Sequence, residues 1–333
     1  YKGRDLLSGN DKTMADIFKM NGYKTGIFGK WHLGDNYPVR PTDCGFDQAV
    51  HHLAGGVGEL SDYWGNSYFD DVYYVNNEAQ QFEGYCTNVW FDQAMKFISE
   101  NKDHPFFAYL PWTPPHGYWA MPEDDPAWLK YKDKQWDASN QKGEYDAQMY
   151  AAMVEMVDRQ IGEIMALLKE LDIDHRTIVF VCGDNGGQAY FKNGKHPHGF
   201  FAPNVDPKTG KRFRGGKGNF YEGGLRIPFI VRWPGKIKEG TVSDHLGYFP
   251  DIMPTLAELA GIEPPTNTDG ISILPTLLGE EPTHSKAEHH EYLYWEDPNS
   301  CAVRKSNWKA IKPAREASFV LYDLSKDLEE LHD

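Results

Sequence analysis

Four short polar segments, each rich in glycine or proline, constrain what this chain can fold into more than any other feature. They read FGKWHLG at residues 28–34, TPPHG at 113–117, GDNGG at 183–187 and GGKGNFYEGGLRIP at 215–228. Each places Lys, His, Asp or Asn beside residues that let the backbone approach a ligand closely and let side chains converge from loops. The combination indicates a site that handles an anion.

Three of these segments directly follow a predicted strand. Apolar runs of strand length occupy residues 25–28, 106–110 and 177–182. Helical periodicity predicts helices at about 88–101 and 145–171. This alternation indicates an α/β fold with a large, mostly parallel sheet between helices. Because ligands gather at the carboxyl ends of the strands in such sheets, we expect the four segments to lie along one edge.

The last part of the chain has a different pattern. Short apolar runs separated by polar turns predict a small antiparallel sheet after about residue 290. We therefore expect a large α/β domain over residues 1–280 and the start of a small C-terminal antiparallel subdomain over residues 281–333. The abrupt first and last residues predict that both parts are truncated.

Charge and composition exclude some classes of partner. The chain has 34 Lys and Arg against 49 Asp and Glu, a formal net charge of -15, and no block of basic residues that would bind nucleic acid. An anionic substrate must therefore be attracted locally, by a few lysines and histidines and a bound cation. No apolar run is long enough to span a membrane. The four cysteines lack CxxC spacing and leave the redox compartment open.

Lys30, His32 and His116 are candidate anion-binding or acid–base residues. Taken alone, Lys30 and His32 could bind any oxyanion, or they could belong to a solvated loop. His116 has the same two interpretations, although the two prolines before it stiffen the chain and favour a positioned acid or base.

Asp184, Asn185 and Lys217 are the candidates in the later segments. Asp184 and Asn185 offer adjacent hard oxygens of the kind that calcium or magnesium prefers, or they cap a turn. Lys217 could reach a phosphate or sulfate oxygen, but the spacing of a P-loop is absent, which disfavours nucleotide binding.

The four segments, in this order and spacing, closely resemble the sulfatase family of arylsulfatase type. RPTDCGFDQ, the EGGLRIPFIVRWPG block, DIMPTLAELAG and the closing LYDLSKD extend the resemblance over nearly the whole chain. It implies the α/β fold shared with alkaline phosphatases and calcium-dependent hydrolysis of sulfate monoesters of carbohydrate or aryl alcohols. Sulfatases of this type are often periplasmic or secreted, so we expect the same here. The resemblance does not extend to an oligomeric state.

The nucleophile that the resemblance implies is a formylglycine, made from Cys or Ser in a CxPxR or SxPxR sequence before FGKWHLG. None of the four cysteines lies in that frame, and NYPVR at 36–40 copies the spacing with Asn36, which cannot be oxidised to an aldehyde. The family's amino-terminal pair of metal-binding aspartates is missing as well. We therefore expect the nucleophile to lie upstream and the chain by itself to be inactive.

The resemblance also implies roles for the candidate residues. Lys30 resembles the lysine that contacts the sulfate and the formylglycine, and His32 the histidine that helps the hydrated aldehyde expel sulfate. His116 and Lys217 resemble the pair at the sulfate and leaving-group oxygens. Asp184 and Asn185 match ligands of one Ca²⁺ ion.

The sequence leaves the substrate and two rival functions open. Loops at 117–136 and 192–207 are candidates for the walls of the pocket, and their aromatic residues could stack on a sugar or aryl ring or pack beneath the loop. One rival is a phosphodiesterase or phosphonate hydrolase of the same superfamily. The other is a non-catalytic protein that binds a sulfated glycan.

Overall fold

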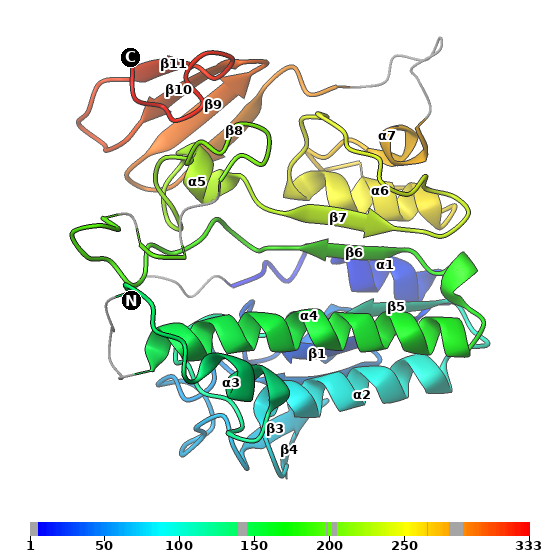
Figure 1. The fold of residues 1–333 in the computed structure, drawn as a ribbon. Coiled ribbons are helices and arrows are strands. Elements are labelled where there is room, and N and C mark those ends of the chain that lie inside the picture. The colour runs from blue at the N-terminus through cyan, green and yellow to red at the C-terminus, as the bar shows by residue number, and fades with distance from the viewer. Residues whose placement is uncertain (1–5, 139–144, 198, 202–204, 265, 280–288) are drawn as a thin grey trace. The chain divides into compact units, whose positions relative to one another are not determined.

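A computed structural model describes residues 6–138, 145–197, 199–201, 205–264, 266–279 and 289–333 of the chain. By its contacts the chain divides into two compact units, drawn in Figure 1. The first unit comprises Tyr1–Lys134 and Gln148–Asp174, and the second comprises Gln135–Ala147 and His175–Asp333. The predicted boundary between residues 280 and 281 lies outside the described residues and stays a prediction.

The first unit is built on a five-stranded sheet in the order β4-β3-β2-β1-β5. Its strands are β1 Lys24–Lys30, β2 Gln48–His52, β3 Val72–Val75, β4 Glu78–Gln81 and β5 Phe106–Tyr109. The central strand β1 pairs in parallel with both β2 and β5, as predicted for the apolar runs at 25–28 and 106–110.

Strands β3 and β4 are antiparallel, which makes the sheet mixed. They are joined by the two-residue connection Asn76–Asn77, with Asn76 in the left-handed region at φ 56°. Two-residue hairpins favour such a conformation because its twist matches that of the strands. The mostly parallel core that positions the candidate residues is therefore β2-β1-β5.

Helices cover both faces of this sheet. The helices of the first unit are α1 Met14–Met20, α2 Cys86–Glu100, α3 Pro126–Tyr131 and most of α4 Asp146–Glu170, with a 3₁₀ turn at Pro41–Cys44. The predictions of helices at 88–101 and 145–171 are confirmed. Helix α1 begins at a capping box in which Thr13 and Asp16 each accept the other's backbone N–H.

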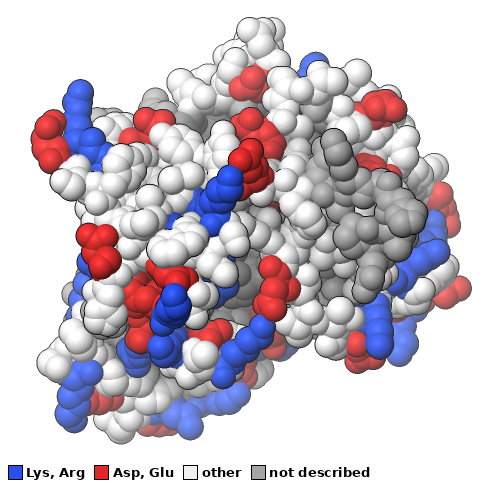
Figure 2. Space-filling view, turned by 90° about the horizontal axis from the view of Figure 1, so that it is seen from above, with Lys and Arg blue, Asp and Glu red and all other residues white. Residues whose placement is uncertain are grey.

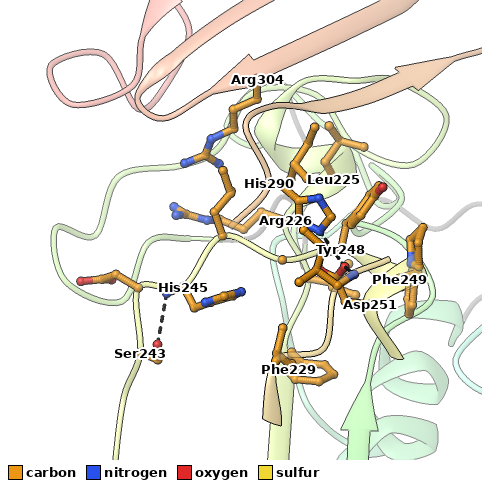
Figure 3. A pocket seen from close by; sticks show the side chains of 18 of the residues that line it. Leu225, Arg226, Phe229, Ser243, His245, Tyr248, Phe249, Asp251, His290 and Arg304 are labelled. Carbon is orange, nitrogen blue, oxygen red and sulfur yellow. Dashed lines mark hydrogen bonds and ion pairs between the residues drawn. The ribbon is translucent and has the colours of Figure 1, made fainter. Parts of the chain in front are cut away.

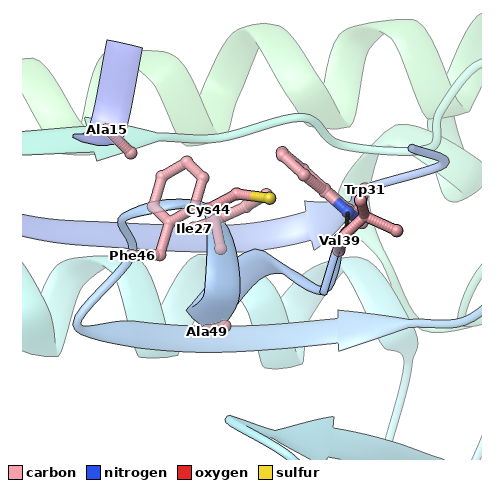
Figure 4. Close-up of a cluster of buried hydrophobic side chains, with 7 residues drawn as sticks. All are labelled: Ala15, Ile27, Trp31, Val39, Cys44, Phe46 and Ala49. Carbon is pink, nitrogen blue, oxygen red and sulfur yellow. Dashed lines mark hydrogen bonds between the residues drawn. The ribbon is translucent and has the colours of Figure 1, made fainter. Parts of the chain in front are cut away.

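One face of β1 packs into the cluster drawn in Figure 4, where Ile27 and Ala49 from neighbouring strands meet Ala15 of α1 and Phe46. The opposite face packs on α2, where Phe28 contacts Phe97 with ring centroids 5.5 Å apart. Because successive strand residues point to opposite faces, Lys30 lies on the same face as Phe28. The sheet thus directs Lys30 toward the α2 side.

The second unit contains two antiparallel sheets. Strand β6 Val179–Cys182 pairs with β7 Phe229–Arg232, and β8 Leu293–Glu296, β9 Cys301–Lys305, β10 Trp308–Lys312 and β11 Val320–Asp323 form a meander. The meander confirms the predicted C-terminal antiparallel sheet. Among the described strands, β6 hydrogen-bonds only to β7.

The helices of the second unit are short. They are α5 Glu222–Leu225, α6 Ile252–Leu259 and α7 Leu274–Leu278, with 3₁₀ turns at Asp174–Arg176 and Phe249–Asp251. Within the described part of the chain, no helix is both long and apolar enough to cross a membrane.

Candidate active site

In the first unit, Lys30 is the last residue of β1 and is half-buried. Its backbone N–H donates to the carbonyl of Pro111, with N and O 2.8 Å apart. Pro111 follows β5, so this bond ties the end of β1 to the loop that carries His116. The structure therefore brings two of the predicted segments side by side.

His116 is held by its own loop. Its backbone N–H donates to Thr113 O at 2.9 Å, and its Nδ1 lies 2.6 Å from Gly117 O. Because a carbonyl oxygen can only accept, the proton of that bond is on Nδ1. The bond fixes the orientation of the imidazole, which suits a residue that transfers a proton at its other nitrogen.

His32 follows β1 in an unusual backbone conformation. Its φ is 58°, in the left-handed region that non-glycine residues rarely adopt. A Cβ added to Gly55 would lie 2.8 Å from both Cε1 and Nε2 of the His32 ring. Only a glycine at position 55 leaves room for the imidazole there, so the loop after β2 fixes the position of His32.

A fourth residue of this unit, His52, was missed by the sequence reasoning. It ends β2, is 1% exposed, and pairs in register with Lys30. Burial lowers the pKa of His52 to about 3, the hydrogen bond to Leu53 O opposes this, and the charges of His51, Lys30 and His32 lower it further. Two consecutive histidines at the end of an apolar strand were the signal that could have identified it.

In the second unit, Asp184 and Asn185 follow β6 as predicted. Asp184 is exposed and Asn185 is half-buried, with its Nδ2 donating to Gly186 O at 3.0 Å. That bond leaves the amide oxygen of Asn185 available beside the carboxylate of Asp184. The pair presents hard oxygen donors of the kind that calcium prefers.

Glycines bring Lys217 next to this pair. The N–H of Lys217 donates to Gly187 O at 3.2 Å, and Gly186 N–H donates to Gly224 O at 3.0 Å. A Cβ on Gly186 would overlap Gly223 O, and one on Gly216 would lie 2.5 Å from Gly187 O. The segments around residues 186, 216 and 223 therefore pack backbone to backbone, and Lys217, itself exposed, is held beside the Asp184 loop.

Buried ion pairs support this loop. Glu222, which begins α5 directly before the packed glycines, lies 2.8 Å from the Nζ of Lys309 on β10, and Lys309 Nζ lies 2.9 Å from Glu330. All three side chains are at most 3% exposed. Burial opposes the ionisation of Glu222, but attraction by Lys309 and Arg304 outweighs it and lowers the pKa of this carboxyl.

The second unit also contains an open pocket of about 1930 Å³, part of whose lining is drawn in Figure 3. Its most buried acid, Asp251, accepts hydrogen bonds from His290 Nε2 at 2.7 Å and from Tyr248 N at 2.9 Å. His245 Nδ1 lies 3.1 Å from the Thr276 hydroxyl. The same pocket is also lined by Asp184 and Asn185.

The predicted substrate loops are described in part. Tyr118 is 63% exposed, whereas Trp119 and Trp128 are half-buried, and His198 lies outside the described residues. On the face shown in Figure 2, Lys and Arg alternate with Asp and Glu and form no continuous basic patch. Any attraction for an anion on this face is therefore local.

The structure thus arranges the six predicted residues in two groups. Lys30, His32 and His116 belong to the first unit, where the end of β1 is hydrogen-bonded to the loop that carries His116. We call these three residues the histidine group, and His52 pairs with Lys30 beside them. Asp184, Asn185 and Lys217 lie together in the second unit, which we call the aspartate group. No set of three or more His, Cys, Asp or Glu that could hold a metal ion occurs among the described residues. Asp184 and Asn185 fit calcium in chemistry but supply only part of its 6–8 oxygen ligands.

Comparison with known proteins identifies the family. The family model described as "Sulfatase" matches residues 2–262, and that described as "N-sulphoglucosamine sulphohydrolase, C-terminal" matches residues 213–333. N-acetylgalactosamine-6-sulfatase of Canis lupus familiaris is 29% identical over 327 residues, covering 93% of this chain and 56% of that protein. An arylsulfatase of Hemicentrotus pulcherrimus is 31% identical over 324 residues, covering 91% of this chain and 52% of that protein.

Solved structures agree. The structure of Ps i-CgsB in complex with k-i-k-neocarrahexaose superposes with a TM-score of 0.79 at 25% identity, covering 99% of this chain and 71% of that one. A structure in complex with its substrate D-glucosamine-2-N,6-O-disulfate superposes with a TM-score of 0.70 at 21% identity, covering 99% and 78%. This chain spans about half the length of the curated relatives it matches. By sequence and by fold, the chain belongs to the sulfatase family.

Proposed function

We propose that the gene product containing this chain hydrolyses sulfate monoesters, most readily those of carbohydrates. The observation that carries the proposal is the histidine group, in which a lysine at the end of a buried strand is joined by a backbone hydrogen bond to a loop that orients His116. A cation and two imidazoles supply what cleavage of a sulfate ester needs, which is charge stabilisation and proton transfer.

Each residue has a role in this proposal. In a loose sulfuryl-transfer transition state, negative charge lies on the equatorial and leaving oxygens. Lys30 stabilises this charge on the equatorial oxygens, and His116 donates a proton to the departing alcohol oxygen. Lys217 of the second unit is assigned a charge-stabilising role of the same kind. His32 accepts a proton from the hydrated aldehyde of the formylglycine nucleophile when sulfate leaves.

Asp184 and Asn185 would hold one Ca²⁺ ion through their side-chain oxygens. The bound ion would polarise a sulfate oxygen as a Lewis acid. If so, a chelator abolishes turnover, added Ca²⁺ restores it, and Asp184→Asn raises the Ca²⁺ concentration needed for half-maximal activity. A protein whose turnover is unaffected by exhaustive chelation would contradict the calcium assignment.

Three of the four cysteines of this chain are poorly suited to serve as the nucleophile. Burial raises the pKa of Cys44 to about 11 and that of Cys86 to about 12, so neither forms a thiolate at neutral pH. Burial and the charge of Asp184 raise the pKa of Cys182 as well. We therefore propose a formylglycine nucleophile, made from a Cys or Ser outside residues 1–333. Mass spectrometry of tryptic peptides of the gene product tests for the aldehyde.

The substrate class is proposed from the relatives. One solved structure of the same fold carries a neocarrahexaose and another a disulfated glucosamine, both carbohydrates. The exposed ring of Tyr118, two residues after His116, is suited to stack on a sugar. Since sulfated glycans are polyanions that do not cross membranes unaided, we also propose that the protein acts in the periplasm or outside the cell.

Turnover of nitrophenyl sulfate against nitrophenyl phosphate mono- and diesters tests the reaction class. We expect sulfate ester turnover, and we expect Lys30→Gln to reduce it by about a hundredfold or more, as loss of a transition-state donor does. Lys24→Gln, at the exposed opposite end of the same strand, is the matched control and keeps full activity. Preference for a phosphate diester would favour the phosphodiesterase, and glycan binding without turnover would favour a non-catalytic binder.

A further inference from the structure

His52 is packed tightly against the histidine group. It is the last residue of β2, and the parallel register sets it directly opposite Lys30 on β1. Its ring stacks on Trp90 of α2, with centroids 5.3 Å apart and planes 21° apart. Paired residues of parallel strands project to the same face, so the side chains of His52 and Lys30 both lie on the α2 side of the sheet.

The hydrogen bonding of His52 is incomplete. Its Nδ1 lies 2.6 Å from the carbonyl oxygen of Leu53, so the ring proton is on Nδ1 and Nε2 carries a lone pair. Nε2 is fully buried and has no hydrogen-bond partner among the described residues. Buried acceptors without a donor are rare in folded proteins because they lose their bonds to water.

The surroundings keep this acceptor neutral. Burial first, and then repulsion from His51, Lys30 and His32, hold the pKa of His52 far below its ordinary value, against the opposing effect of the bond to Leu53. The ring is therefore uncharged throughout the range in which sulfate esters are turned over near neutrality. A neutral acceptor next to the Lys30 ammonium can accept a hydrogen bond from it and does not compete with it for the anion.

We propose that His52 is a positioning residue: its Nε2 accepts a hydrogen bond from the ammonium group of Lys30 when an anion occupies the site. Backbone pairing already holds the two residues side by side, so rotation about the side-chain torsions of Lys30 suffices to form the bond. An ammonium group has three protons, which lets Lys30 donate to Nε2 and to sulfate oxygens together. The inference rests on the proposed function in assigning sulfate as the anion.

His52→Phe removes the acceptor and keeps an aromatic ring against Trp90. We expect it to reduce kcat/KM for nitrophenyl sulfate by about tenfold to a hundredfold, the usual range for residues that orient a ligand-binding group. His52→Gln, whose amide oxygen can reach the place of Nε2, recovers most of the loss. If the His52 ring only filled the core, Phe would preserve activity better than Gln. Higher activity in His52→Gln than in His52→Phe therefore indicates that the hydrogen-bond acceptor is needed.

His51→Phe is the matched control. His51 is buried next door, makes the same kind of Nδ1 contact to a carbonyl, and packs near Tyr74, but it pairs with Gly29 and so faces the other side of the sheet. We expect His51→Phe to change thermal stability about as much as His52→Phe and to leave kcat and KM unchanged. Equal losses of activity in the two variants would overturn the inference.

A double variant tests the route through Lys30. If His52 acts by holding that ammonium, His52→Phe has no further effect on kcat/KM in a Lys30→Gln background, because the partner is already gone. Additive losses would show that His52 acts some other way. Turnover by the wild type that is lost in Lys30→Gln supports the proposed function separately. A His52→Phe variant with wild-type kcat/KM would therefore contradict this inference and leave the proposed function standing.

A measurement on the unsubstituted protein covers the case in which the variants fold poorly. The ¹⁵N resonances of His52 report the Nδ1-protonated tautomer, and we expect the Nε2 resonance to shift toward a hydrogen-bonded value on titration with inorganic sulfate. The shift should be absent in Lys30→Gln. A protein that binds sulfate through Lys30 without a change at Nε2 contradicts the inference, and one that binds no sulfate contradicts the proposed function as well.

Discussion

The two units position their candidate residues by different physical means. In the first unit, sheet register and backbone carbonyls orient rings and one lysine, and the supporting residue His52 is neutral. In the second unit, glycines let three chain segments touch, and buried ion pairs of Glu222, Lys309 and Glu330 lie behind them. The comparison predicts that the second unit is sensitive to lost charge and added volume, whereas the first is sensitive to small displacements of its rings.

The largest effect is expected at Lys309. Lys309→Met leaves the buried carboxyl group of Glu330 without its cation and leaves Glu222 with only its longer ion pairs to Arg304 and Arg226, which should lower the free energy of unfolding by about 3–5 kcal/mol. Urea denaturation measures the loss. Lys305→Met is the control on the neighbouring strand, because its pair with Glu291 is exposed and should contribute little.

A further variant separates charge from packing at this place. Replacing Lys309, Glu222 and Glu330 together by Met, Gln and Gln removes the unpaired charges and should recover much of the stability that Lys309→Met loses. If Lys309→Met unfolds at the same urea concentration as Lys305→Met, the buried ion pairs do not stabilise the second unit and the comparison fails.

The next effect is expected at Gly186. Gly186→Ala places a Cβ where Gly223 O lies, and backbone cannot move aside cheaply, so we expect a loss of about 1–3 kcal/mol or more. Gly194→Ala, in the same unit but with nothing near its Cβ, should have almost no effect. Unfolding curves and sulfatase turnover should fall together for Gly186→Ala, because the same packing holds Lys217 beside Asp184. A stable but inactive Gly186→Ala variant would mean that the glycine is needed for the approach of a ligand and not for the packing of the three segments.

Sequence reasoning predicted the local features of both units. The helix predicted at 145–171 matches α4 to one residue at each end, because its periodicity is strong and continuous. The strands before Lys30, before His116 and before Asp184 were also predicted, since apolar runs ending in glycine or proline are local signals. Five of the six candidate residues then fall, as expected, at the strand ends or in the loops that follow, whereas Lys217 lies in a later loop that no predicted strand precedes.

The features that the sequence did not predict depend on contacts between distant segments. His52 can be identified as a candidate only when β2 is known to pair with β1 in a register that sets it opposite Lys30. That register depends on packing against α2. The antiparallel pairing of β6 with β7 was missed for the same reason. The buried pair of Glu222 and Lys309 joins residues 87 positions apart, which no local pattern indicates.

A smaller effect on stability, but a clear one on activity, is expected in the first unit at Gly55. Gly55→Ala forces the His32 ring to move, since its Cε1 and Nε2 would lie 2.8 Å from the new Cβ. The ring is the end of a side chain and can move, so the free energy of unfolding should hardly change. A displaced imidazole should still lower kcat/KM, by up to about a hundredfold for a shift near 1 Å.

Gly56→Ala is the control for this prediction, because the atoms nearest its Cβ belong to the flexible side chain of Glu59, with Oε1 3.0 Å away, and not to His32. The outcome that breaks the comparison is the reverse pattern, in which Gly55→Ala loses stability and keeps its activity. The first unit would then resemble the second, with glycines that serve packing.

The smallest effect is expected at Asp43, in the 3₁₀ turn after the His32 loop. The side-chain hydrogen bonds from Arg40 outweigh burial and hold the pKa of the Asp43 carboxyl below its ordinary value of 3.8. A carboxyl whose pKa is lower in the folded state stabilises the fold above its unfolded pKa, and this contribution is lost as the pH falls through the folded value. The difference in unfolding free energy between wild type and Asp43→Asn should therefore be constant near neutral pH and shrink below about pH 4.

Arg40→Gln should follow the same curve, because removing either partner ends the same pair. The Arg40–Asp43 pair is partly exposed, whereas the ion pairs around Lys309 are buried. If Asp43→Asn lost as much free energy of unfolding as Lys309→Met, exposure would not govern how strongly each unit depends on its charges.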